Sequence, residues 1–267
     1  SGALFRRASF AGLAGSFGEV TFGRRLNPLI LNYIQNQINN SNSTTVVTMA
    51  SANFADFWIK NAITYTSPNL NGLTVQAQYA PSNLAGAQDN GSVTAVAARF
   101  VTGGLELHAS AQDLKVAPTG VPSAATNTAQ ATTAGKQSQV IGAKYTMGPY
   151  SVSATSFESK QNNPVPVAAT AVKRNGYNVA VGYKVSQALN TSLQYTEVQW
   201  SGADKAKMVS LQAHYALSPR SSLYAMVNDV QQGKIATIIP AWGSRGFAGG
   251  VVGIDQQALA VGVIHRF

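Results

Sequence analysis

The chain ends in Gln257-Ala-Leu-Ala-Val-Gly-Val-Ile-His-Arg-Phe267, where larger apolar residues alternate with small ones. Leu259, Val261 and Val263 share a face with His265 and Phe267, so the last residue belongs to the apolar face. This period of two predicts a strand, although the ends of soluble domains usually fray. A strand that finishes on an aromatic residue suits a barrel that closes at the aromatic girdle of a membrane interface. We therefore expect the same alternation in the rest of the chain.

From Phe57 onward, apolar and polar positions alternate almost continuously, and Gly, Pro, Asn and Ser clusters interrupt them as turns do. Thirteen strands are predicted, joined by connections that are alternately short and long. The short turns lie at Gly15–Gly18, Ser67–Asn71, Thr102–Gly104, Gly148–Pro149, Ser186–Leu189 and Ser218–Ser221. The long connections span about 26–56, 81–90, 113–135, 160–172, 202–206 and 232–256. Short connections on one rim and long ones on the other are typical of a bacterial outer-membrane β-barrel.

Aromatic residues on the apolar face flank several of the short turns. They are Tyr65, Phe100, Tyr145, Tyr150, Tyr183 and Tyr215, to which the terminal Phe267 is added. Such positions predict a periplasmic aromatic girdle. The alternative is that they are core aromatics of a soluble β-sandwich.

The strand count is itself informative, because such barrels contain an even number of strands and start and finish on the short-turn side. Here the first predicted strand, Phe5–Leu13, already runs into a short turn. We expect an odd number of strands to precede residue 1, and three would give sixteen. The prediction is thus a single all-β domain over residues 1–267, a transmembrane antiparallel barrel without its N-terminal strands.

Composition narrows the function classes. Charged residues are 11% of the chain, yet no apolar run reaches the ~18 residues of a spanning helix. There is no cysteine for a disulfide or a thiolate site. The net charge of +9 favours nucleic acid, anionic lipid or an anion path as partner, but scattered cations without a recognised motif argue against nucleic acid.

An enzyme is a further alternative, because some outer-membrane barrels hydrolyse lipid or peptide. The chain has only His108, His214 and His265, and none lies in a recognisable nucleophile motif. We therefore predict no catalytic residue, no cofactor and no metal.

The first long connection, about 26–56, differs from the others. Asn27-Pro28 is a helix-start signal, and Leu29, Ile30 and Tyr33 then recur at helical spacing. A connection of this length inside a compact domain usually has a function.

Several segments of the chain carry a family resemblance. They are Leu4-Phe-Arg-Arg-Ala-Ser-Phe-Ala-Gly-Leu13, Phe17-Gly-Glu-Val-Thr-Phe-Gly-Arg-Arg-Leu-Asn-Pro28, Asn61-Ala-Ile-Thr-Tyr-Thr-Ser-Pro-Asn-Leu-Asn-Gly72, the repeated Tyr-x-x-Ser/Gly turn entries and the terminal His-Arg-Phe267. With these segments the chain resembles, over its whole length and in order and spacing, the trimeric general porins of Gram-negative outer membranes, in the neisserial-type branch. In that family the Phe-x-Arg-x-Ala segment is the fourth of sixteen strands, which agrees with the strand count.

The resemblance implies an outer-membrane homotrimer whose water-filled channels let ions and small hydrophilic solutes diffuse passively. It implies that residues 26–56 are the third loop, which folds into the barrel and narrows the pore. It also implies contact with outer-membrane lipid and lipopolysaccharide, and recognition by the barrel-assembly machinery through the C-terminal strand that ends at Phe267. The alternative function is a non-conducting barrel that serves as an adhesin or structural protein.

The resemblance also supplies candidate pore residues. Arg7 and Arg24 match wall arginines that face the constriction in the family, although strict alternation turns Arg24 inward only if a bulge lies near Gly23. Alternation points Trp58 and Lys60 inward. The family often has an arginine where Trp58 stands, so Lys60 is the residue that replaces its charge.

Alternation places further charges on the lumen side. Arg99, Lys144 and Lys184 face inward, against Glu106 as the clearest acid. Asp56 is the only acid of the 26–56 connection, whereas an acidic loop is common in the family. We therefore expect a positive local field and weak to moderate anion selectivity. The alternative for any one of these cations is that it merely solvates the wall or binds lipid phosphate.

Overall fold

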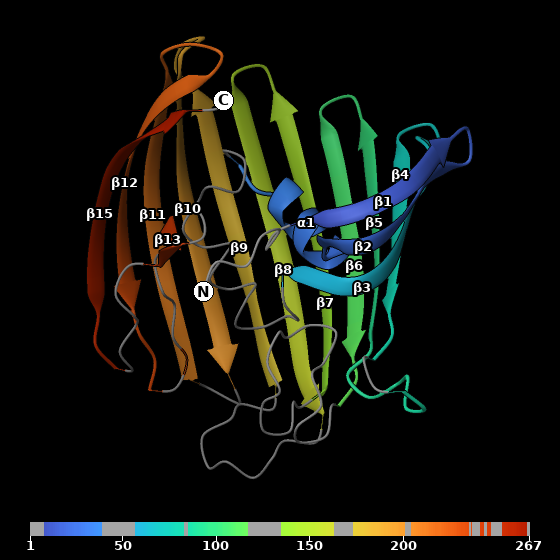
Figure 1. Cartoon of the computed structure of the whole chain (residues 1–267). Coiled ribbons are helices and arrows are strands. Elements are labelled where there is room, and N and C mark those ends of the chain that lie inside the picture. The colour runs from blue at the N-terminus through green and yellow to red at the C-terminus, as the bar shows by residue number, and fades with distance from the viewer. Residues whose placement is uncertain are drawn as a thin grey trace.

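The computed structural model describes residues 8–38, 57–82, 85–116, 135–162, 173–200, 204–234, 236, 241–242, 245–246 and 253–265 (Figure 1). Its main element is one antiparallel sheet of 13 strands in the order β1 to β12 followed by β15. These strands are β1 (Ser9–Gly15), β2 (Gly18–Leu26), β3 (Trp58–Thr66), β4 (Leu73–Ala80), β5 (Val93–Thr102), β6 (Leu105–Leu114), β7 (Gly135–Met147), β8 (Tyr150–Asn162), β9 (Lys173–Lys184), β10 (Leu189–Trp200), β11 (Asp204–Ala216), β12 (Ser221–Gln231) and β15 (Gln256–His265). A separate hairpin joins β13 (Ala241–Trp242) to β14 (Arg245–Gly246).

Every neighbouring pair in the main sheet is consecutive along the chain, apart from the step from β12 to β15. The all-β fold and the thirteen strands predicted from the sequence are confirmed. In the described residues β1 and β15 are the two ends of the sheet and do not pair with each other. Three preceding strands therefore stay a prediction. No helix in the described part of the chain is long and apolar enough to cross a membrane.

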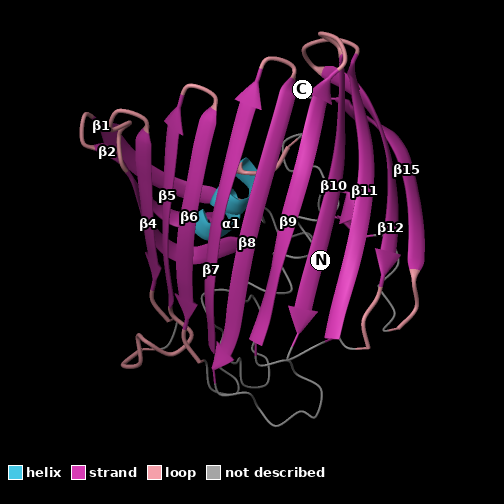
Figure 2. Cartoon of the chain, turned by 180° about the vertical axis from the view of Figure 1, so that it is seen from behind, coloured by secondary structure: helices cyan, strands magenta, loops and turns pink. Residues whose placement is uncertain are grey.

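All six predicted short turns join adjacent strands, and they gather at one rim of the sheet (Figure 2). The turn between β7 and β8 shows why the sequence bends there. Gly148 has a φ of 57°, in the left-handed region that glycine adopts without strain, and Pro149 follows it. The alternation of connections read from the sequence thus corresponds to two distinct rims.

The faces of the sheet are reversed relative to those of a soluble protein. Leu193 on the convex face is 48% exposed, whereas the neighbouring Gln194 on the concave face is 4% exposed. A convex face of exposed Leu, Val and Tyr side chains requires an apolar medium, because water would not tolerate an apolar surface of this extent. The concave face, by contrast, carries many polar side chains between two apolar clusters, and helix α1 lies against part of it.

The aromatic residues next to the short turns lie on this convex face. Tyr145, Tyr150, Tyr183 and Tyr215 are each exposed, and the Tyr150 and Tyr183 rings lie 5.1 Å apart between centroids. Exposed rings cannot be the core of a soluble sandwich, so that alternative is wrong. The arrangement fits an interfacial girdle. The terminal Phe267 lies outside the described residues.

Helix α1 (Pro28–Gln35) lies against the concave face of the sheet (Figure 1). The predicted start is confirmed, because the Asn27 side chain accepts a hydrogen bond from the Leu29 N–H at 3.0 Å and Pro28 is the first helical residue. Leu29, Ile30 and Tyr33 are fully buried. The Tyr33 ring meets Phe157 of β8 edge to face at 6.4 Å. Apolar packing thus fixes which face of the helix meets the wall.

Candidate functional site

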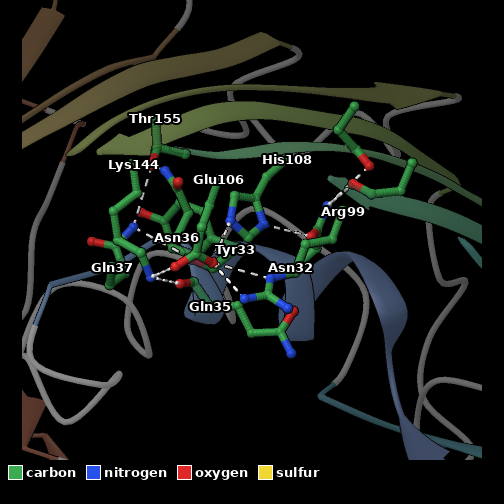
Figure 3. Close-up of polar contacts among 12 residues, drawn as sticks. Asn32, Tyr33, Gln35, Asn36, Gln37, Arg99, Glu106, His108, Lys144 and Thr155 are labelled. Carbon is green, nitrogen blue, oxygen red and sulfur yellow. Dashed lines mark hydrogen bonds and ion pairs between the residues drawn. The ribbon is translucent and has the colours of Figure 1, made fainter. Parts of the chain in front are cut away.

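Three charged side chains form a row on the concave face behind α1. Arg99 of β5, Glu106 of β6 and Lys144 of β7 come together because Glu106 is paired directly with Lys144 and Arg99 with His108, two residues along. The Arg99 guanidinium donates to Glu106 Oε2 through Nη2 at 2.5 Å and Nε at 3.1 Å, and Lys144 Nζ lies 2.9 Å from Oε1 (Figure 3). One carboxylate shared by two cations leaves the row with a net charge of +1.

His108 links this row to the helix. The Asn32 amide donates to the carbonyls of Ala98 and Ala109 at 3.2 and 2.9 Å, which fixes its Oδ1 as the acceptor facing His108 Nδ1 at 2.8 Å. His108 therefore carries its proton on Nδ1. Its Nε2 faces Glu106 Oε2 at 3.6 Å.

The C-terminal end of α1 is attached to the wall by a second group of contacts (Figure 3). Lys144 Nζ donates to the Gln35 carbonyl at 2.8 Å, so a cation lies at the negative end of the helix dipole. Asn36 donates to the Ala154 carbonyl at 3.0 Å and to Thr155 Oγ1 at 2.6 Å. Lys144 thus both balances Glu106 and holds the helix.

Gly142 of β7 makes room for this attachment. A methyl group on its Cα would clash with Asn36 Nδ2 and would lie 2.9 Å from Asn36 Cγ, well inside contact distance. Glycine thus lets the Asn36 amide lie against the strand, and a larger residue would have to displace this amide. Burial also raises the pKa of the Tyr33 phenol above its ordinary value, so the ring between these contacts is an uncharged anchor.

The sequence analysis placed Arg24 on the inner face only if a bulge lies near Gly23. The structure has an irregularity there, because the register of β2 against β3 shifts between Gly23 and Arg25. Arg25 is then paired with the buried Ile59 on the concave face, lies 3.1 Å from Glu19 and stacks over the Phe10 ring at 4.1 Å. Arg24 is paired with Ser9 of β1 and is half-buried. The register thus brings Arg25, which the sequence analysis did not single out, to the concave face.

A second irregularity affects Trp58 and Lys60. Asn61 has a φ of 50°, and Ile59 and Ala62, three residues apart, are both buried in the same concave-face cluster. Simple alternation therefore does not run through Asn61. Trp58 and Lys60 flank Ile59 and are both partly exposed.

The remaining candidates are spread along the wall. Lys184 is exposed at the short-turn end of β9, where it is paired with Asn190 and is not part of the row behind α1. Arg7 and Asp56 lie outside the described residues. The helix contacts of Asn32 and Asn36 were not predicted. Their spacing of four residues puts both on one face of a helix, and that signal was available in the sequence.

Comparisons with known proteins identify the family of the chain and proteins of similar fold. The model of the family described as Gram-negative porin matches residues 1–234. The chain belongs to the Gram-negative porin family. No curated protein matches the sequence of this porin.

Solved structures show the same fold. The anion-selective porin from Comamonas acidovorans superposes with a TM-score of 0.79 at 22% identity, over 98% of this chain and 78% of that one. OmpT of Vibrio cholerae in its trimer form gives 0.70 at 17% identity, over 100% and 82%. OmpF of Salmonella typhi in complex with daunomycin gives 0.65 at 16%, over 97% and 78%.

Membership of the family decides the broad function. This porin is an outer-membrane β-barrel protein that forms a channel for passive diffusion of small solutes, and it is not an enzyme. The convex apolar face with its aromatic residues and the polar concave face agree with that role. The assignment to a neisserial-type branch stays a prediction.

Proposed function

We propose that the channel of this porin conducts anions in preference to cations. The supporting observation is the balance of charge on the concave face of the described strands. Strand register and alternation place six cations and three carboxylates there. They are Arg25, Arg99, Lys136, Lys144, Arg174 and Lys184, against Glu19, Glu106 and Asp204. A low-dielectric wall with this excess attracts anions and repels cations.

Each of the three carboxylates also has an ion-pair or hydrogen-bond partner. Glu19 pairs with Arg25, Glu106 is shared by Arg99 and Lys144, and Asp204 accepts the backbone N–H groups of Lys234 and Ala236. Outside the described residues the sequence contains a single acid, Asp56. The rest of the chain therefore has little negative charge with which to cancel the excess.

Single-channel conductance in substituted salts tests the proposal. With the purified protein in planar bilayers, replacing chloride by the larger acetate should lower the conductance more than replacing potassium by lithium does. The opposite order would refute the anion preference while leaving the channel function intact.

We further propose that residues 26–56 narrow the lumen. The support is the position of α1 on the concave face, fixed there by Asn32, Asn36 and Lys144. Asn36→Ala should widen the range of sugars that enter proteoliposomes in a swelling assay. An unchanged size limit would argue against the proposal.

The assembly we propose is a homotrimer, supported by the trimer form of the similar OmpT structure. Crosslinking of the protein in outer membranes should give a three-subunit band, and a monomer alone would contradict it.

For the outer leaflet we propose lipopolysaccharide as the lipid partner. The support is a group of ion pairs on the convex face toward the long-connection rim, with Glu158–Lys173 at 2.9 Å and Glu197–Lys205 at 2.6 Å.

Recognition by the barrel-assembly machinery is proposed through the C-terminal strand. Its support is the unbroken alternation of β15, which continues in sequence to Phe267. Phe267→Ala should lower the amount of protein that reaches the outer membrane without changing the conductance of the molecules that do. Normal assembly of this variant would contradict the proposal.

A further inference from the structure

A second basic cluster lies on the concave face, close to the long-connection rim, where Trp200 packs against the same apolar cluster as Leu29, Ile30 and Tyr33 of α1. Lys136 is the second residue of β7, Arg174 is the second residue of β9, and Trp200 is the last residue of β10. Arg174 and Trp200 are directly paired across the two strands, and the guanidinium carbon lies 4.2 Å from the centre of the indole ring. All three side chains are partly exposed.

The strand register brings Lys136 toward this pair. Arg174 is paired with Ser159, and Ser159 is paired with Ser138, two residues along β7 from Lys136. The hydroxyls of Ser138 and Ser159, which lie between the two cations, are hydrogen-bonded to each other at 3.2 Å. The register thus places Lys136 and Arg174 on the same face of the sheet at the same rim, with only β8 between their strands.

The cluster is rich in donors. Stacking on an aromatic face orients the plane of a guanidinium, whose N–H groups form a fixed planar fork of donors. The Trp200 Nε1–H is buried and has no hydrogen-bond partner among the residues that the structure describes. The neighbouring acid is Asp204, paired with Trp200 across β10 and β11, and its carboxylate accepts the backbone N–H groups of Lys234 and Ala236 at 2.7 and 2.5 Å.

We propose that Lys136, Arg174 and Trp200 form a binding site for small oxyanions, carboxylates or phosphates, on the lumen wall near the long-connection rim. A planar fork, an ammonium and an indole N–H together supply several donors to a ligand with more than one acceptor oxygen. A halide has no such set of oxygens. The inference rests on the proposed anion preference. It adds the class of anion that is bound, small oxyanions, and the position of the binding site on the wall.

Block of chloride current by inorganic phosphate tests the site. In bilayers at constant chloride, millimolar phosphate should reduce the single-channel current of the unaltered protein, more strongly from one side than from the other. Lys136→Gln and Arg174→Lys should each raise the half-blocking phosphate concentration about fivefold or more, because a change of about 1 kcal/mol corresponds to that ratio. Arg174→Lys keeps the charge but loses the planar fork.

Lys184→Gln is the matched control, because it removes one concave-face cation at the opposite rim. It should leave the half-blocking concentration unchanged. Trp200→Phe keeps an aromatic ring but removes the N–H, and it should weaken the block by a smaller factor than Arg174→Lys does.

The proposed site is overturned if phosphate does not block the unaltered channel, or if Lys184→Gln weakens the block as much as Lys136→Gln does. Both results are compatible with a channel that still prefers chloride to potassium. A cation preference in the unaltered protein would instead overturn the proposed function. The two failures are therefore distinguishable.

Discussion

Replacing Glu106 with glutamine removes the one carboxylate between Arg99 and Lys144 while keeping the size of the side chain and an oxygen that accepts hydrogen bonds. The net charge of the row then rises from +1 to +2. Glu106 is the right residue for this change because its side chain is 18% exposed on the concave face and is 2.9 Å or less from a nitrogen of each cation.

The size of the effect follows from Coulomb's law. One unit charge acts on a monovalent ion about 7 Å away in water with about 0.6 kcal/mol, and 0.1 M salt screens this to about 0.3 kcal/mol. Because anions gain this energy and cations lose it, the anion-to-cation permeability ratio should rise about threefold. The assay is the zero-current potential of purified channels in a KCl gradient.

Glu158→Gln is the matched control. Glu158 lies on the convex face, where it pairs with Lys173 and is 40% exposed, so its loss changes the net charge equally but away from the lumen. The zero-current potential should stay at the wild-type value. An equal shift in both variants, or none in Glu106→Gln, would refute the assignment of this row to the conducting wall.

Much of the fold follows from local patterns in the sequence. The period of two, the turn residues and the Asn27-Pro28 helix start are each decided by a few neighbouring residues, and the strands, the six short turns and α1 lie where these patterns place them. The lumen site depends on irregularities and on contacts between distant segments. Asn61 interrupts the alternation of β3, so alternation along the sequence does not predict which face of the sheet Trp58 and Lys60 occupy.

The contacts of α1 show why contacts between distant segments could not be predicted. Lys144 was predicted to face the lumen, but its bond to the Gln35 carbonyl depends on how α1 is placed against β7, more than a hundred residues away in sequence. No local pattern encodes that placement. Gly142 is informative only once Asn36 is known to lie against it.

Two further variants test the helix attachment and the wall. Gly142→Ala should displace Asn36 and increase open-channel current noise, whereas Ala143→Ser on the opposite face should not; equal noise in both would contradict the close approach. Leu193→Lys should destabilise the folded protein in lipid by about 2 kcal/mol or more, while Leu193→Met should have little effect in the same urea titration. A tolerated lysine at this exposed position would mean that the convex face does not meet the hydrocarbon.

The zero-current potential of the unaltered protein in a KCl gradient tests the central claim most directly. The excess of cations on the concave face predicts a potential whose sign reports chloride as the more permeant ion. Raising the salt concentration should reduce the preference, because screening weakens the field of the wall. A potential of the opposite sign, with potassium more permeant, would contradict an anion-preferring channel.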